Sequence, residues 1–121
     1  MKNISESELE VMQVLWRMGE CTSTQIVKEV NKKKEWKTNT IMTMVSRLSE
    51  KGYIEVIRNQ GALLLYKPLI EEYDYKSTET NNFLERMYEG SVNNMLVAFA
   101  KSKKLTKKDV EELLNLIEED E

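Results

Sequence analysis

The chain has 121 residues, of which 40% are hydrophobic and 32% are charged, a composition typical of a soluble, helix-rich protein. It has no histidine and a single cysteine, Cys21, which excludes an intramolecular disulfide and a zinc site of Cys and His ligands within one chain. Because the usual general base is missing, we expect no enzymatic activity and no cofactor. The net charge of −3 combines +3 over residues 1–70 with −6 over residues 71–121, so only the first part suits a polyanion such as nucleic acid.

Hydropathy favours a cytoplasmic protein. The densest apolar stretch, Met95 to Ala100, is much shorter than a membrane span. Met1-Lys2 leads directly into a helical pattern without an apolar signal segment. We therefore expect a cytoplasmic location and no membrane association of the chain itself.

The first helix is predicted to begin at a capping box, Ser5-x-x-Glu8, and to end at Gly19. Trp16 falls on its apolar stripe, so we interpret this side chain as part of the core and not as a binding residue. The stripe repeats at helical spacing through Leu9, Met12, Leu15 and Trp16.

A second helix is expected after a short bridge or edge strand at Glu20-Cys21-Thr22, with Thr22 or Ser23 as its cap. Cys21 is interpreted as a small buried residue. The run Lys32-Lys33-Lys34 then makes a basic connection, which either faces solvent or follows a phosphate backbone. The apolar residues of this second helix are Ile26, Val27 and Val30.

The segment from Trp36 to Tyr53 predicts a third helix, closed by Gly52, with an unusual outer face. A surface helix normally covers its outer face with Lys and Glu, whereas this one has short polar side chains and one guanidinium. The predicted buried stripe is Ile41, Met44, Val45 and Leu48. The predicted outer face is Asn39, Thr40, Met42, Thr43, Ser46 and Arg47.

Short donors and acceptors with an arginine are suited to entering the major groove of DNA. An ordinary core helix with a mild surface is the alternative for this segment. Three helices in close succession, the last with this outer face, match a helix-turn-helix arrangement.

A hairpin follows the third helix and extends the prediction to a winged helix. Ile54 to Arg58 forms a short strand, Asn59-Gln60-Gly61 is a turn signal, and Leu63 to Leu69 forms a second strand stopped by Pro68. In a winged helix the hairpin lies on the DNA backbone beside the groove. The candidate phosphate contacts there are Arg58 and Lys67, with Gln60 as the candidate wing tip.

Amphipathic helices fill the rest of the chain, so we divide it into a winged-helix domain at 1–70 and a helical region at 71–121. Helical patterns run from Glu71 to Glu89, from a cap at Ser91, and from a cap at Thr106 assisted by Asp109. These helices have too little partner surface of their own, which favours packing against a second subunit; folding back within a monomer is the alternative. The candidate dimerisation residues are Phe83, Met87, Val92, Met95, Leu96, Phe99, Val110, Leu113, Leu114 and Ile117.

Three segments resemble the penicillinase repressor family, which includes the β-lactamase, methicillin-resistance and copper-responsive repressors of Gram-positive bacteria. They are I-S-E-S-E-L-E-V-M-Q-V-L-W, W-K-T-N-T-I-M-T-M-V-S-R-L-S-E-K-G-Y-I and the hairpin end L-Y-K-P. The resemblance covers essentially the whole chain. It implies a homodimeric winged-helix repressor whose C-terminal helices intertwine and present two recognition helices to an operator with dyad symmetry, built on TACA/TGTA elements.

The resemblance also implies roles for individual residues. Thr40, Thr43 and Arg47 match the family's DNA contacts, with Trp36 and Tyr66 near the backbone. A recognition helix over about residues 37–51 adds Lys37 at its start, and Ser46 shares the outer face.

This chain departs from the β-lactamase branch at three positions that affect DNA contacts. Lys and Arg are common where it has Asn39 and Met42, so Asn39 is expected to pair with adenine and Met42 to contact a thymine methyl. Ala62 stands where a basic residue is common, which removes a phosphate contact and softens the salt dependence.

The resemblance leaves the inducing signal open between two routes. In the β-lactamase branch a membrane sensor protease cuts an Asn-Phe bond in the C-terminal region. The aligned pair here is Ala98-Phe99, which keeps only the phenylalanine, and we carry it as a candidate cleavage site. The copper-responsive branch uses paired Cys-x-Cys motifs near the C-terminus, and their absence here argues against copper sensing by that mechanism.

Two functions from different classes follow. The first is a transcriptional repressor that occludes a promoter as a dimer. The second is a winged-helix protein-interaction module that docks through its acidic helices; it predicts that Thr43 and Arg47 are dispensable.

Overall fold

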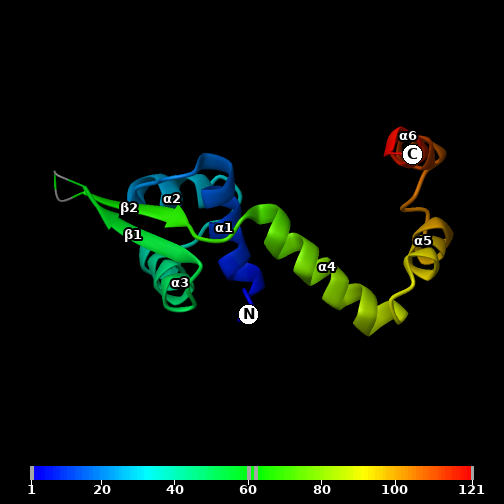
Figure 1. The fold of residues 1–121 in the computed structure, drawn as a ribbon. Coiled ribbons are helices and arrows are strands. Elements are labelled where there is room, and N and C mark those ends of the chain that lie inside the picture. Colours follow the sequence, from blue (N-terminus) through cyan, green and yellow to red (C-terminus); the bar gives the residue numbers. More distant parts are fainter. Residues whose placement is uncertain (1, 60, 62, 121) are drawn as a thin grey trace. The chain divides into compact units, whose positions relative to one another are not determined.

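The computed structural model describes residues 2–59, 61 and 63–120, with side chains through residue 118. Contacts divide the chain into two units, Met1–Tyr75 and Lys76–Glu121, each of which is described by itself. The first unit contains α1 (Glu6–Met18), α2 (Ser23–Val30), α3 (Thr38–Glu50), β1 (Ile54–Arg58), β2 (Leu64–Pro68) and the start of α4 (Glu72–Tyr88). The second contains the rest of α4, α5 (Val92–Lys101) and α6 (Lys107–Asp120). The order of elements is the predicted one, and the fold class is confirmed as mainly helical with a small hairpin (Figure 1).

The helix boundaries of the first unit follow local chemistry. The predicted capping box is present at Ser5 and Glu8, and Thr22 caps α2 with Gln25 in the same manner. Lys51 ends α3, and Gly52 follows with a φ of 88°. The backbone N–H of Gly52 donates to the carbonyl of Ser49 at 3.0 Å, which turns the chain out of the helix.

One hydrophobic core joins α1, α2, α3 and the hairpin. The predicted apolar stripe of α3 is buried in full, and Trp16 lies at the edge of the core, where its Nε1 donates to the carbonyl of Ile70 at 2.9 Å. Cys21 is fully buried, as predicted. The buried core residues are Val11, Met12, Val14, Leu15, Cys21, Ile26, Val30, Ile41, Met44, Val45, Leu48, Tyr53, Ile54 and Tyr66.

The hairpin is antiparallel and pairs Ile54 with Pro68 at its open end. A further bridge joins it to the connection between α1 and α2, where Cys21 and Tyr66 exchange two backbone hydrogen bonds of 3.0 and 2.8 Å. The predicted bridge at Glu20-Cys21-Thr22 is therefore confirmed. Figure 1 shows the two strands running beside α2 and α3, the arrangement of a winged helix.

A buried ion pair connects the start of α1 to the end of α3. Glu8 is 2% exposed, and its Oε1 accepts hydrogen bonds from the Lys51 ammonium at 2.6 Å and from the backbone N–H of Ser5 at 2.9 Å. Burial raises the pKa of the Glu8 carboxyl, but the Lys51 and Ser5 hydrogen bonds outweigh it and hold the pKa below its ordinary value. The carboxylate therefore stays charged at neutral pH.

The first unit extends five residues beyond the predicted boundary at residue 70 because Tyr75 packs within it. The Tyr75 ring is 5% exposed and lies 6.0 Å from the Trp16 ring and 6.1 Å from the Tyr53 ring, between centroids. The backbone N–H of Ile4 donates to its hydroxyl at 3.3 Å. The first turn of α4 thus belongs to the winged helix.

The described part of the second unit consists of helices with exposed or half-buried side chains. Ser91 caps α5 and Thr106 caps α6 with Asp109, as predicted. None of the described side chains between residues 76 and 118 is buried. The apolar residues with at least a third of their surface exposed include Phe83, Met87, Val92, Val97, Val110, Leu113, Leu114, Leu116 and Ile117.

No helix in the part of the chain that the structure describes is both long enough and apolar enough to span a bilayer.

Replacement of Gly52 by alanine is expected to destabilise the first unit. A Cβ at this position would meet no atom within 4 Å, so the effect comes from the left-handed backbone. An L residue in that region costs about 1 to 2 kcal/mol. Urea unfolding followed by tryptophan fluorescence measures this change, with Glu50→Ala in the exposed last turn of α3 as the control. Equal stability of Gly52→Ala and wild type would show that the helix end does not need glycine.

Candidate nucleic-acid interface

The outer face of α3 is exposed and has few charges. The exposed residues along it are Asn39, Thr40, Thr43, Ser46 and Arg47. Met42 differs from the prediction because it is half-buried and packs against the core, so only part of its side chain faces outward. This face offers hydroxyls, an amide and one guanidinium, the groups that read base edges.

A hydrogen bond within α3 fixes what Thr43 can present. Its hydroxyl donates to the backbone carbonyl of Asn39 at 2.8 Å, one turn earlier. The oxygen lone pairs remain available as acceptors and the methyl group as an apolar contact. Thr43 therefore suits a base that presents an amino group or a methyl.

The start of α3 has no side-chain cap. Lys37 occupies the N-cap position and makes no capping hydrogen bond, so the first-turn amides have no cap acceptor from this residue. Such a helix start attracts anions, because the backbone N–H groups and the helix dipole both favour negative charge. The exposed Lys37 ammonium adds a full positive charge at the same place.

Trp36 stands immediately before this helix start and is held by Asn31. The Asn31 side chain accepts from the Trp36 backbone N–H and donates to its carbonyl, both at 2.9 Å. The Trp36 ring is half-buried against the core, and the Lys34 ammonium lies 5.6 Å from its centroid. The predicted site residue Trp36 thus lies beside the start of α3.

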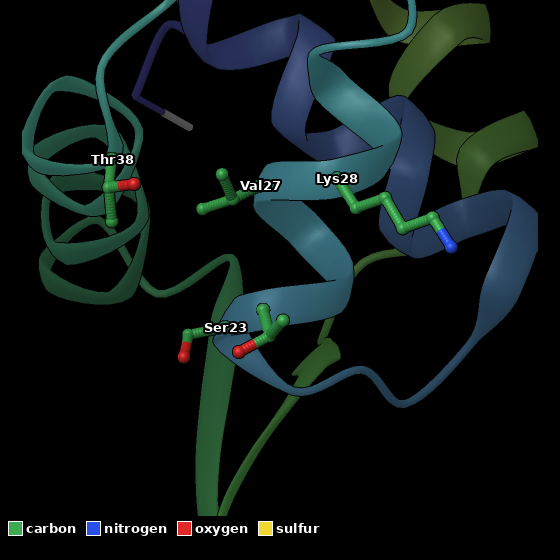
Figure 2. Close-up of a pocket in the computed structure, with 5 residues that line it drawn as sticks. Ser23, Val27, Lys28 and Thr38 are labelled. Atoms are coloured by element: carbon green, nitrogen blue, oxygen red, sulfur yellow. The ribbon is translucent and has the colours of Figure 1, made fainter.

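A groove between the starts of α2 and α3 was not predicted from the sequence (Figure 2). It has a volume of about 290 Å³ and is lined by Ser23, Thr24, Val27, Lys28 and Thr38. Figure 2 shows Val27 pointing from α2 towards Thr38, with Ser23 at the start of α2 and Lys28 extending away from Thr38. Three hydroxyls at two helix starts suit a phosphate group. The signal in the sequence was the pair Ser23-Thr24 directly after the capping Thr22.

The two basic residues predicted in the hairpin lie on different faces of it. Arg58 and Lys67 are both exposed. In the strand register, Lys67 lies opposite Glu55 and Arg58 lies opposite Leu64. Because side chains alternate along a strand, Arg58 and Lys67 lie on opposite faces of the hairpin. Their roles as phosphate contacts stay predictions.

Three further hairpin positions were named from the sequence. Tyr66 is 7% exposed and packs in the core on the same face as Ile54, so little of its side chain faces outward, and its place near the DNA backbone stays a prediction. Gln60 and Ala62 lie outside the described residues.

The basic run after α2 is partly neutralised by acidic neighbours. The Lys32 ammonium lies 2.6 Å from Glu29, which Arg17 also contacts at 3.0 Å, and the Lys34 ammonium lies 3.9 Å from Glu10. The Lys32 hydrogen bond is the main cause that holds the pKa of Glu29 below its ordinary value. This run is therefore weaker as a phosphate-binding segment than its composition suggests.

The sequence of the chain is similar to those of known proteins over almost its whole length. The family model "Penicillinase repressor" matches residues 4–119. The penicillinase repressor of Bacillus licheniformis is 35% identical over 116 residues, which are 96% of this chain and 90% of the relative. The methicillin resistance regulatory protein MecI of Staphylococcus aureus (strain N315) is 32% identical over 114 residues, 94% of this chain and 92% of the relative.

A solved structure agrees with the fold of the first unit. The solution structure of monomeric Bacillus licheniformis BlaI in complex with the blaP half-operator is 38% identical with a TM-score of 0.54, covering 61% of this chain and 89% of that chain. The resemblance predicted from sequence motifs is thus confirmed across almost the whole length. The chain belongs to the penicillinase repressor family.

Proposed function

We propose that the chain is a DNA-binding transcriptional repressor that acts in the cytoplasm as a homodimer, with α3 of each copy in the major groove of one half-site. The observation that carries this proposal is the exposed polar face of α3 in a winged-helix unit. The similarity to BlaI, which was solved with a half-operator, supports it.

Base recognition is assigned to the outer face of α3. The guanidinium of Arg47 can pair bidentately with guanine, and the Asn39 amide with adenine. The Thr43 oxygen accepts from a base amino group, since its own proton is used within the helix. These short side chains let the helix backbone approach the base edges closely.

Phosphate contacts are assigned to two helix starts. The hydroxyls of Ser23, Thr24 and Thr38 line one groove, and Lys37 stands at the uncapped start of α3. Such contacts position a protein on the duplex without reading its sequence. They leave sequence discrimination to the face of α3.

Dimerisation is assigned to the second unit because it cannot bury its apolar residues alone. No described side chain there is buried, although α5 and α6 each have an apolar stripe. Two copies that cover each other's stripes would remove this surface from water. A dimer also binds two half-sites together, which raises its affinity through effective concentration.

Inactivation by proteolysis is assigned to the bond between Ala98 and Phe99. Both residues are half-buried in α5, a helix of ten residues without a buried side chain. Local opening of such a helix requires little free energy, which would give a protease access to the bond. Cutting there would remove Phe99 and all of α6 from the second unit.

Arg47→Ala is expected to weaken binding to the DNA upstream of the protein's own gene by about 1 to 3 kcal/mol, because a base contact is lost. Fluorescence anisotropy at several salt concentrations measures this, with a scrambled duplex of equal length beside it. Arg17→Ala is the control, since Arg17 pairs with Glu29 away from the proposed interface. Unchanged affinity of Arg47→Ala would remove Arg47 from the site, and no preference of the wild type for its own DNA would favour a protein-interaction module.

Leu113→Asp is expected to separate the dimer, because a carboxylate would be buried in the apolar contact without a partner. Sedimentation velocity reports the change in mass. Asn115→Asp adds the same charge to α6 outside the apolar stripe and should remain dimeric. A dimer that survives Leu113→Asp would place the contact on other residues.

Co-expression with the cognate membrane sensor protease under inducing conditions is expected to produce a fragment that ends at Ala98. Mass spectrometry of the purified protein identifies it. In Phe99→Asp the fragment should be absent. Detection of only the full-length wild-type chain in induced cells would argue against this route.

A further inference from the structure

The middle of α3 is held by contacts that have little direction. Its buried stripe packs on α1, α2 and the hairpin through apolar side chains. Hydrophobic burial depends on the area removed from water and is not directional. A small rotation or shift of α3 would disturb this packing but keep most of the apolar area buried, whereas it would directly bend or lengthen a hydrogen bond at either end of the helix.

The start of α3 is held by a directional contact. Asn31, the residue that ends α2, forms two hydrogen bonds of 2.9 Å with the backbone of Trp36, one as donor and one as acceptor. The two bonds together fix both the distance and the orientation of the chain that enters α3. We refer to Asn31 and Trp36 as the entry clip.

The end of α3 is held by a second directional contact. Lys51, the residue that ends α3, donates to the buried carboxylate of Glu8 at 2.6 Å and to the carbonyl of Asn3 at 2.9 Å. Glu8 is itself fixed in α1 by its hydrogen bond with the Ser5 backbone N–H. We refer to Glu8 and Lys51 as the exit clip.

We propose that the entry and exit clips set the rotation and axial position of α3 in the groove, and that Asn31 and Glu8 are positioning residues for base recognition. This inference rests on the proposed function. Neither side chain has to touch DNA: each acts through the backbone or the side chain at one end of the recognition helix.

The geometric demands of base recognition connect the clips to specificity. A binding constellation has to be held within roughly 0.5 Å and 10 to 20° of its productive geometry. A bidentate contact from Arg47 to a guanine is of this kind. Contacts between ammonium groups and phosphates are less demanding, because the attraction acts between point charges and involves many equivalent sites along the duplex. Loosening a clip should therefore reduce specific binding more than non-specific binding.

Glu8→Gln tests the exit clip with little change in size. The variant removes the charge that holds Lys51, while the Lys51 ammonium, whose side chain is 27% exposed, can turn to water. Glu6→Gln is the matched control, since it removes the same charge from an exposed position in the first turn of α1. Thermal unfolding of both variants gives the temperature range in which each is fully folded, and anisotropy titrations are carried out within that range.

The expected result is a change in the ratio between the affinity for the native upstream DNA and the affinity for the scrambled duplex. Glu8→Gln should bind the native upstream DNA roughly tenfold more weakly, the loss of about one good base contact. Its affinity for the scrambled duplex should stay within about twofold of that of Glu6→Gln, since phosphate contacts dominate there. The double variant Glu8→Gln/Arg47→Ala should lose less than the two single effects combined, because both act on the same contact.

The outcomes that would overturn the inference are distinct from a failure of the proposed function. A lowered melting temperature with an unchanged ratio of affinities would make Glu8 a purely structural residue. If Glu8→Gln does not fold, Asn31→Ala tests the entry clip from an exposed position, and the same unchanged ratio would overturn the inference. A wild-type protein without preference for its own upstream DNA would instead overturn the proposed function itself.

Discussion

The burial of one stripe of α3 is the constraint on which the rest of the first unit depends. Ile41, Met44, Val45 and Leu48 point into the core, so the opposite face of the same helix is the part left for a partner. Because α1, α2 and the hairpin all pack against this core, they also determine which face of α3 remains open. Folding uses one face of α3, and the proposed recognition uses the other.

The second unit, in contrast, leaves the apolar stripes of its helices exposed. Ser91 and Thr106 cap α5 and α6 through side-chain hydrogen bonds, but a cap satisfies only the backbone groups at a helix end. Helices of 10 and 14 residues are at or below the length that is stable in water by itself. The apolar stripes of α5 and α6 are exposed within a single copy, and covering them would stabilise the unit. The proposed dimer would cover both, because a second copy would present matching stripes.

Local sequence signals predicted most of the fold, whereas contacts between side chains of different elements could not be predicted from the sequence. The capping box at Ser5 and Glu8, the glycine at Gly52 and the apolar period of α3 act within a few residues, and each was correct. The burial of Tyr66 depends on its place beside Cys21, 45 positions earlier, and the partial burial of Met42 depends on the core beside it, so no local pattern showed either. The groove at Ser23 and Thr38 joins two helix starts and has no single local pattern. Similarly, the Glu8 and Lys51 pair spans 43 positions, so a sequence pattern could show the cap but not the clip.

The division into two units has a consequence for how such a repressor can be released from DNA. The proposed DNA-reading face lies within the first unit, which has its own core, while the proposed dimer contacts lie within the second. A signal that damages the second unit therefore leaves every base and phosphate contact chemically intact. What it removes is the effective concentration that ties the second half-site to the first. Since a single winged helix has only its own contacts to hold it, each copy of the proposed dimer would then dissociate at the rate of a half-site complex, and release would follow without any change in the surface proposed to read the sequence.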